Sequence, residues 1–241
     1  MRPAPERGPL GEQSSARGLA FPLAFGAGGA AVLIALGIWQ LDRLGWKEGL
    51  IAEAEARLAA DPRPLPAAPD PATDDWTRVR VEGRIKGDGE TYVLTSQKLL
   101  GPGYRIVVPF ETDGGRRILL DRGFVPEAER DPATREPVPE RMAVTGVLRW
   151  PNETGAFTPD PVPERSEWYA RDVARMAAAL GTEPLLVVAE PHGGRKHPRG
   201  TQPKVTLPNN HFGYAMTWFS LAAIWLAMTA ALVWRVRRGE A

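Results

Sequence analysis

The stretch GLAFPLAFGAGGAAVLIALGIWQL, residues 18–41, decides how this chain folds, because it contains no Asp, Glu, Lys or Arg. A second uncharged apolar run, FGYAMTWFSLAAIWLAMTAALVW, covers residues 212–234 near the other end of the chain. A helix needs roughly 20 apolar residues to cross the hydrocarbon core of a bilayer. Both runs are long enough, so the sequence predicts two transmembrane helices in a lipid bilayer, separated by a long polar segment.

The charges beside the two runs predict their orientation. Arg17 precedes the first run, and three arginines in residues 235–241 follow the second. Lys and Arg close to the ends of a transmembrane helix mark its cytoplasmic side. Both termini are therefore expected in the cytoplasm, with residues 1–17 as a disordered tail and residues 235–241 as a basic tail.

The same orientation places the polar segment on the far side of the membrane. In a bacterial inner membrane this side is the periplasm, and in the alternative, a mitochondrial inner membrane, it is the intermembrane space. Mitochondrial presequences avoid acidic residues, whereas Glu6 and Glu12 lie in the N-terminal tail. The sequence therefore favours the bacterial inner membrane.

Two further segments precede the main part of the polar region. In residues 42–60 the apolar positions recur at helical spacing, which predicts an amphipathic extension of the first helix. Residues 61–73 begin with DPRPLPAAPDPA, and proline lacks the amide hydrogen that a helix interior needs. We expect these residues to form a stiff, extended connector without helix.

Residues 74–207 predict a β-rich domain, because their apolar residues alternate with polar ones or form short β-branched runs. The predicted strands cover residues 79–81, 92–94, 104–110, 118–120, 144–148 and 185–188. Asp113-Gly114-Gly115 predicts a hairpin turn, and residues 171–180, closed by Gly181, predict one inserted helix. The predicted fold class is membrane α+β: two transmembrane helices flank an exported, mainly antiparallel β domain, built as a small barrel or a sandwich.

Composition excludes several classes of function. The chain has no cysteine, which excludes disulfides, zinc ribbons, thiolate copper sites and covalent haem attachment through CxxCH. The net charge of +1 and the lack of a basic run argue against nucleic acid as a partner. Neither GxSxG, HExxH nor a Walker loop is present, so the sequence predicts a protein that is not an enzyme.

The three histidines differ in their setting. His192 and His197 lie in the turn-rich stretch PHGGRKHPRG, where solvated loop histidines are expected and a shared metal site is the weaker alternative. His211 stands directly before the second apolar run. Neutral imidazole is an axial ligand of haem iron, and an ionisable group at a membrane span indicates function. The alternative is an interfacial side chain that helps to cap the helix.

Aromatic and cationic residues near both spans allow two interpretations each. Trp218, with Phe219 and Trp225, forms either a wall of a porphyrin pocket or a packing face between the two helices. The small residues that would allow close packing are Gly26, Gly28, Gly29, Ala215 and Ala222. Arg43 and Lys47, one helical turn apart, either anchor to lipid headgroups or pair with propionates or acidic partner residues.

Three motifs resemble one known family. They are GIWQLDRLGWKEGLI at residues 37–51, GPGYRIVVPF with ILLDRGFVP at residues 101–110 and 118–126, and NNHFGYAMTWFSLA at residues 209–222. Together with the two-span layout, they are similar to the surfeit locus protein 1 family of cytochrome oxidase assembly factors. The resemblance covers the chain from Leu36 onward.

The resemblance implies a chaperone that binds haem a and helps its insertion into the catalytic subunit of a haem–copper oxidase, with haem a synthase as a further candidate partner. Carried over by motif, the histidine proposed to bind haem iron is His211, and Arg43 and Lys47 match the first motif. For Asp121-Arg122-Gly123 in the second motif we expect a turn at a strand end. The rival hypothesis is a cofactor-free membrane scaffold that holds a folding intermediate of the catalytic subunit.

Overall fold

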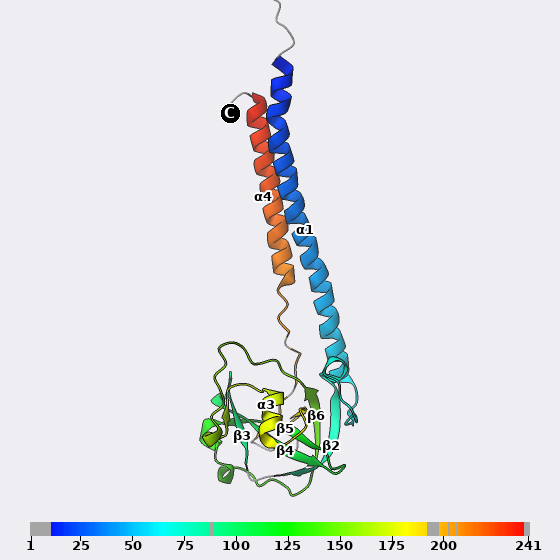
Figure 1. Ribbon diagram of the computed structural model, residues 1–241, viewed down its shortest axis with the longest axis vertical. Coiled ribbons are helices and arrows are strands. Elements are labelled where there is room, and N and C mark those ends of the chain that lie inside the picture. The colour runs from blue at the N-terminus through cyan, green and yellow to red at the C-terminus, as the bar shows by residue number, and fades with distance from the viewer. Residues whose placement is uncertain (1–10, 87–88, 192–197, 202, 206, 239–241) are drawn as a thin grey trace, which may run out of the picture. The chain divides into compact units, whose positions relative to one another are not determined.

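The computed structural model describes residues 11–86, 89–191, 198–201, 203–205 and 207–238, and these divide into two compact units (Figure 1). One unit comprises Met1–Ile51 with Leu207–Ala241, and the other comprises Ala52–Thr206. The first is helical and the second holds all the strands. His192 and His197 lie outside the described residues.

The first unit contains α4 and most of α1, whose last residues belong to the second unit. α1 covers Gly11–Ala59 and α4 covers His211–Arg238 (blue and orange in Figure 1). In the described chain, Leu19–Ala59 and His211–Arg238 are long and apolar enough to cross a membrane, and few of their residues are buried within the protein. Helices that expose apolar side chains in this way are expected to face lipid.

The bounds of α1 differ from the predicted segments. The sequence predicted a span at residues 18–41 and an amphipathic extension to residue 60, and the structure joins both in one helix. α1 also begins at Gly11, inside the stretch predicted as a disordered tail. Glu12, Gln13 and Ala16 have high helix propensity, and extending an existing helix costs much less than nucleating one.

α1 and α4 lie side by side because glycines on α1 accept large side chains from α4 (Figure 1). A Cβ atom at Gly29 would lie 2.5 Å from the ring of Trp225, and one at Gly37 would lie 2.5 Å from the ring of Phe219. The Trp225 Nε1 atom donates a hydrogen bond of 3.0 Å to the carbonyl oxygen of Gly26. Packing between the helices thus accounts for Phe219 and Trp225, as one of the two interpretations expected.

The small residues contribute unequally to this packing. Ala215 and Ala222 on α4 are buried, and Gly26 and Gly29 on α1 accept α4 side chains. Gly28 is different, because a Cβ atom there would meet nothing within 4 Å. The expectation that Gly28 belongs to the contact is wrong, since a helix turns by 100° per residue and carries Gly28 away from the face that Gly29 presents.

Gly29→Val is expected to force the two helices apart. Its Cβ would lie 2.5 Å from the Trp225 ring, whereas carbon atoms prefer separations of about 3.5–4.0 Å, so a shift of about 1 Å or more is needed. Spin labels on Leu23→Cys and Met228→Cys in this cysteine-free chain measure the separation. Gly28→Val is the matched control and should leave the distance unchanged. An unchanged distance in Gly29→Val would contradict the packing described.

Five strands of the second unit close into a small barrel. Around the ring β2 pairs with β6, β6 with β8, β8 with β5, β5 with β4, and β4 with β2. The bounds are β2 Arg78–Ile85, β4 Gly101–Thr112, β5 Arg117–Pro126, β6 Met142–Arg149 and β8 Leu186–Ala189. All neighbouring pairs are antiparallel except β5 with β8. The predicted mainly antiparallel β domain is confirmed, and of the two architectures considered it is barrel-like.

Short elements extend the barrel. β3, Thr91–Gln97, pairs with β4, and two-residue strands add to the edges: β1, Arg63–Pro64, on β2 and β7, Glu167–Trp168, on β3. Three turns of 3-10 helix cover Glu127–Glu129, Pro132–Thr134 and Pro163–Arg165. All six predicted strands are present, and Asp113-Gly114-Gly115 lies in the turn between β4 and β5, as predicted.

Alternating side chains divide the core into two layers. Ile118 and Leu120 of β5 point into the barrel with Phe110, whereas Leu119 points outward. The outer layer is covered by the helix α3, Val173–Leu180, through Met176. Asp172 caps the start of α3 and Gly181, with φ of +63°, ends it, so the predicted helix is confirmed.

The proline-rich connector is more ordered than predicted. Besides β1, it contains one helical turn, α2, Pro71–Asp74. The expectation that this segment forms no helix is wrong, because Pro71 occupies the first helical position, where its missing amide hydrogen is not needed. The side chain of Asp70 caps the turn by accepting a hydrogen bond of 2.9 Å from the amide of Ala72.

Asp121-Arg122-Gly123 forms a β-bulge inside β5 rather than a turn at its end. The register of β4 and β5 shifts there, with Ile106 opposite Gly123 and Val107 opposite Asp121, so Arg122 is the extra residue. The predicted strand end is wrong because a bulge lets the strand continue. Gly123 has φ of +113°, and a Cβ atom there would lie 2.0 Å from a backbone oxygen, so only glycine fits.

Candidate functional site

His211 is held between the two long helices by a hydrogen bond to Gln40. His211 is the first residue of α4 and is half-buried. Its Nδ1 atom lies 2.8 Å from the side-chain oxygen Oε1 of Gln40 on α1. Gln40 is only 9% exposed, although it lies at the end of an apolar stretch. The helix pair thus fixes the imidazole through one of its two ring nitrogens.

The pairing of Gln40 with His211 follows from the spacing of residues on each helix. On α1 the positions that face α4 include Gly26, Gly37 and Gln40. On α4, Ala215 and Ala222 are buried one and three turns after His211. Such intervals of three, four and seven residues keep one face of a helix against its neighbour. Gln40 and His211 are therefore the polar end of an otherwise apolar contact.

The capping alternative for His211 involved its neighbours Asn209 and Asn210. The backbone carbonyl of Asn210 accepts a hydrogen bond of 3.3 Å from the amide of Tyr214. The side-chain oxygen of Asn209 is buried and accepts no hydrogen bond in the described part of the chain. The side chain of Asn209 therefore satisfies none of the free amides at the start of α4 through that oxygen.

Arg43 lies over two tryptophan rings on the same helix. Its guanidinium carbon is 4.8 Å from the ring centre of Trp46 and 5.9 Å from that of Trp39. Both rings are about half exposed. Cation–π contacts of this kind orient the guanidinium while leaving its N–H groups accessible. Arg43 therefore presents a positioned positive charge at the exposed surface of α1.

Lys47 and Trp218 complete the set of predicted site residues. Lys47 is half-buried and lies seven residues after Gln40, two turns further along the same face of α1. Trp218 is half-buried and lies seven residues after His211 on the same face of α4. The structure brings His211 together with Gln40. Among the described residues, no hydrogen bond joins His211 to Arg43, Lys47 or Trp218.

Gln40 is the residue that the sequence did not assign to the site. Gln40 lies at the end of the first apolar run, where the sequence indicates no partner for it. The usable signal was its register, since Gln40 follows Gly26, Gly29 and Gly37 on the small-residue face. A polar side chain on a helix-contact face in a membrane needs a partner on the facing helix.

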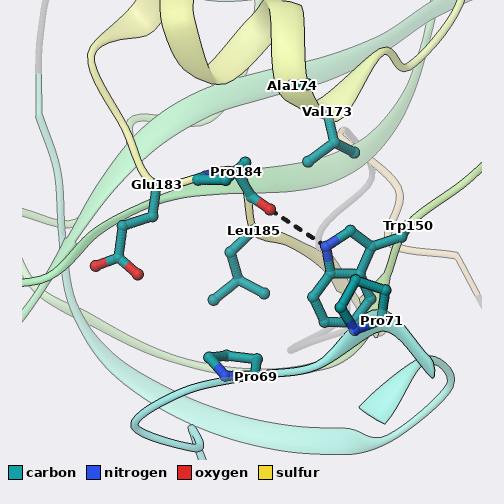
Figure 2. A pocket seen from close by; sticks show the side chains of 8 residues that line it. All are labelled: Pro69, Pro71, Trp150, Val173, Ala174, Glu183, Pro184 and Leu185. Carbon is teal, nitrogen blue, oxygen red and sulfur yellow. Dashed lines mark hydrogen bonds between the residues drawn. The ribbon is translucent and has the colours of Figure 1, made fainter. Parts of the chain in front are cut away.

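A groove in the β-containing unit offers no comparable chemistry (Figure 2). It has a volume of about 350 Å³ and is lined mainly by apolar residues, including Pro69, Pro71, Val173 and Leu185. The Trp150 Nε1 atom already donates a hydrogen bond of 3.2 Å to the carbonyl oxygen of Pro184 (dashed in Figure 2). In the described chain, no three His, Cys, Asp or Glu side chains are grouped so that they could hold a metal ion.

Charged side chains form a structural network around the buried Asp121. This residue is fully buried and accepts hydrogen bonds from Arg105 Nε at 2.6 Å and Arg171 Nη1 at 3.4 Å. Arg171 also pairs with Glu153, and Arg105 Nη1 donates to the Thr201 hydroxyl at 3.0 Å. Two carboxylates and two guanidinium groups balance in charge. We assign this network to folding rather than to chemistry.

The network makes the stability of the folded protein depend on pH in the acidic range. Burial raises the pKa of Glu153, but the hydrogen bonds and positive charge of Arg171 outweigh it and leave this pKa below its usual value of 4.5. A carboxyl whose pKa is lower in the folded state stabilises the fold above its unfolded pKa and loses that contribution as pH falls through the folded pKa. The free energy of unfolding should therefore fall as the pH drops below about 4.5. This is the usual pKa of a glutamate, and folding lowers it for Glu153.

Glu153→Gln tests the origin of this decline. Denaturation midpoints of the full chain at pH 7, 5, 4 and 3 should fall less steeply for the variant, because it has no proton to bind at that site. Asp160→Asn, at a carboxylate that is 89% exposed, is the control and should follow the wild-type curve. Parallel curves for wild type and Glu153→Gln would contradict the assignment.

Comparison with known proteins gives one consistent result. The sequence model described as the SURF1 family matches residues 27–223. Surfeit locus protein 1 of Mus musculus is 35% identical over 216 residues, which are 80% of this chain and 69% of the mouse protein. The SURF1-like protein of Monosiga brevicollis is 38% identical over 215 residues, or 82% of each chain. Surfeit locus protein 1 of Homo sapiens is 35% identical over 213 residues, covering 78% and 69%.

Proposed function

The chain belongs to the SURF1 family, and from this premise we propose that it binds haem a and helps its insertion into the catalytic subunit of a haem–copper cytochrome c oxidase. Membership in the family implies a role in cytochrome c oxidase assembly. The observation that supports haem binding is the position of His211. Its imidazole is half-buried at the start of α4, and Gln40 contacts one of the two ring nitrogens.

The residues of the helix pair suit a haem in their chemical type. His211 supplies a nitrogen donor, since Nε2 remains when Nδ1 is hydrogen-bonded. Arg43 supplies an oriented cation, and Lys47 supplies a second on the same helix. Carboxylates pair well with guanidinium and ammonium groups, so these two residues would bind the propionates. Trp218, on the face of His211, would pack against the apolar macrocycle.

The proposed topology follows the charges beside the helices. α4 ends with three arginines, Arg235, Arg237 and Arg238, which favour the cytoplasmic side. His211, at the other end of α4, would then lie near the outer surface of a bacterial inner membrane, and the β barrel would be exported. Haem a would be received and passed on at the outer leaflet.

A carrier of haem a must be able to release the haem as well as bind it. A carrier whose bound state is too stable cannot transfer its ligand, because transfer is limited by the difference in affinity between donor and acceptor. We therefore propose transient binding of haem a, with the oxidase catalytic subunit as acceptor and haem a synthase as a candidate donor. No covalent chemistry by this chain is part of the proposal.

The experiment that tests this function is the haem a content of the oxidase in cells that lack the gene for this chain. Purified catalytic subunit from these cells should contain less haem a than wild-type enzyme, and expression of the chain should restore it. The haem b content of the same membranes serves as the control. An oxidase with full haem a content in the absence of the chain would contradict the proposal.

The contact between Gln40 and His211 also favours a second candidate. A polar pair of this kind holds two transmembrane helices together without a cofactor, at about 0.6 kcal/mol on average for such bonds. The chain would then be a scaffold that holds a folding intermediate of the oxidase subunit. The two candidates differ in colour, since a carrier purified with haem has a Soret band and a scaffold has none.

A further inference from the structure

We propose that Gln40 is a positioning residue that fixes the tautomer of His211, so that Nδ1 carries the proton and Nε2 presents its lone pair. As a statement about the imidazole, this inference holds for the protein without cargo. As a statement about haem, it rests on the proposed function.

The atoms in contact indicate the tautomer. The Gln40 atom that faces the ring is the amide oxygen Oε1, at 2.8 Å from Nδ1. An amide oxygen accepts hydrogen bonds and donates none, so Nδ1 must be the donor. In neutral imidazole only one nitrogen carries hydrogen. The other nitrogen, Nε2, is then left with the lone pair that a metal ion or a hydrogen-bond donor needs.

Burial makes this hydrogen bond effective. Gln40 is 9% exposed and lies on the face that α1 presents to α4. Inside an apolar contact, water does not compete for the amide, and a lost bond leaves a buried polar group unsatisfied. Rotation of the ring or a change of tautomer would break the contact with Oε1. The imidazole is therefore restricted in both orientation and tautomer.

The packing one turn away keeps Gln40 within reach. Gly37, three residues before Gln40, allows the ring of Phe219 to approach, since a Cβ atom there would lie 2.5 Å from that ring. This close approach sets the separation of the helices next to the polar pair. Gln40 projects from a continuous helix, so its Cα atom has a fixed position along α1. The small residues set the separation of the helices, and Gln40 binds His211 across that separation.

The chemical nature of the acceptor also matters. A histidine that binds a metal usually donates its other N–H to a carboxylate or a carbonyl oxygen, which fixes the ring and raises its basicity. A carboxylate would attract the Nδ1 proton most strongly and make His211 a stronger donor. The neutral amide of Gln40 gives the same orientation with a weaker increase. This choice suits a ligand that holds haem a and then releases it.

The first test uses the complete chain without cargo, in detergent, with ¹⁵N-labelled histidine at a pH where imidazole is neutral. The ¹⁵N resonances of His211, assigned by their loss in His211→Ala, should report the Nδ1–H tautomer. Gln40→Met, which keeps the side-chain length but provides no amide oxygen, should shift the resonances toward the Nε2–H tautomer. Gln40→Glu keeps an acceptor and should retain Nδ1–H.

Trp225→Phe is the matched control. It removes another hydrogen bond between the same helices, that from Trp225 Nε1 to Gly26, and leaves Gln40 in place. Its His211 resonances should be those of the wild type. Wild-type protein in the Nε2–H tautomer, with the amide nitrogen of Gln40 donating to Nδ1, would overturn the inference. So would an unchanged tautomer in Gln40→Met.

A second measurement separates this inference from the proposed function. Titration with haem a should give about 10–100-fold weaker binding in Gln40→Met than in the wild type, as expected for a lost partner of a metal-binding histidine. Trp225→Phe should bind as the wild type does. If the tautomer depends on Gln40 while neither protein binds haem a, the proposed function fails and the tautomer assignment stands. Equal haem affinity in Gln40→Met and wild type would refute the positioning role.

Discussion

Asp121→Ala is expected to destabilise the barrel far more than the removal of an exposed carboxylate on its surface. Asp121 is fully buried, and its removal leaves the guanidinium groups of Arg105 and Arg171 with less negative charge beside them. Removing one partner of a buried ion pair costs about 3–5 kcal/mol. Asp121 Oδ1 also accepts a hydrogen bond of 3.0 Å from the amide of Gly123, so the bulge loses its internal bond.

The expected size of this effect is large against the total stability of a domain. A loss of 1 kcal/mol lowers the melting temperature of a domain of 150–250 residues by roughly 2–4 °C, so a fall of about 10 °C is expected. Circular dichroism of the full chain in detergent measures it. Asp160→Ala removes a surface partner of Arg175 and should change stability by less than about 1 kcal/mol. Equal melting temperatures for Asp121→Ala and Asp160→Ala would contradict a structural role for the network.

His211→Ala is expected to abolish the binding of haem a. The substitution removes the nitrogen donor itself, so its effect should exceed the about 10–100-fold loss that follows when a supporting partner is removed. Cells that carry this variant in place of the wild type should produce oxidase with low haem a content. The measurement is haem a bound per purified chain, together with haem a in the oxidase.

Gln40→Met is the matched control for this variant. Both substitutions break the hydrogen bond between the helices, but only His211→Ala removes the imidazole. A much greater loss in His211→Ala than in Gln40→Met would identify His211 as the ligand. Equal losses in both variants would show that the contact between the helices matters and that the imidazole does not bind haem.

The sequence predicts most of the fold because its signals are local. Uncharged runs of transmembrane length need no knowledge of their partners, and alternation of apolar residues marks strands such as residues 118–120 whichever strands they pair with. Closure of the barrel is not a local property. It depends on the register of β4 with both β2 and β5, which places residues 110–112 beside residues 83–85.

The errors arise where one residue type serves two purposes. Proline breaks the interior of a helix but is favourable at its first position. The prolines of the connector therefore argued against a helix, although one of them begins α2. Gly123 resembles a turn glycine, yet its positive φ serves a bulge within a strand. The ion network could not be predicted, because the pair of Arg105 with Asp121 depends on the register of β4 against β5. Arg171 lies 50 residues after Asp121, just before α3, and joins the network only when the chain is folded.

The site shows the same division between local and distant information. The sequence predicts a function for His211 because an ionisable residue at a membrane span costs free energy. Gln40 does not, because its role depends on a partner 171 residues away. The pairing emerges only from the register of α1 against α4, which the glycines on α1 set.

The most direct test of the central claim, that this chain carries haem a, is an absorbance spectrum of the complete protein. The chain is co-expressed with the enzymes of haem a synthesis, purified in detergent and compared with His211→Ala at equal protein concentration. The account predicts a Soret band and haem a bands in the wild type that are lost in the variant. A colourless wild-type protein under these conditions would contradict the carrier function and favour the cofactor-free scaffold.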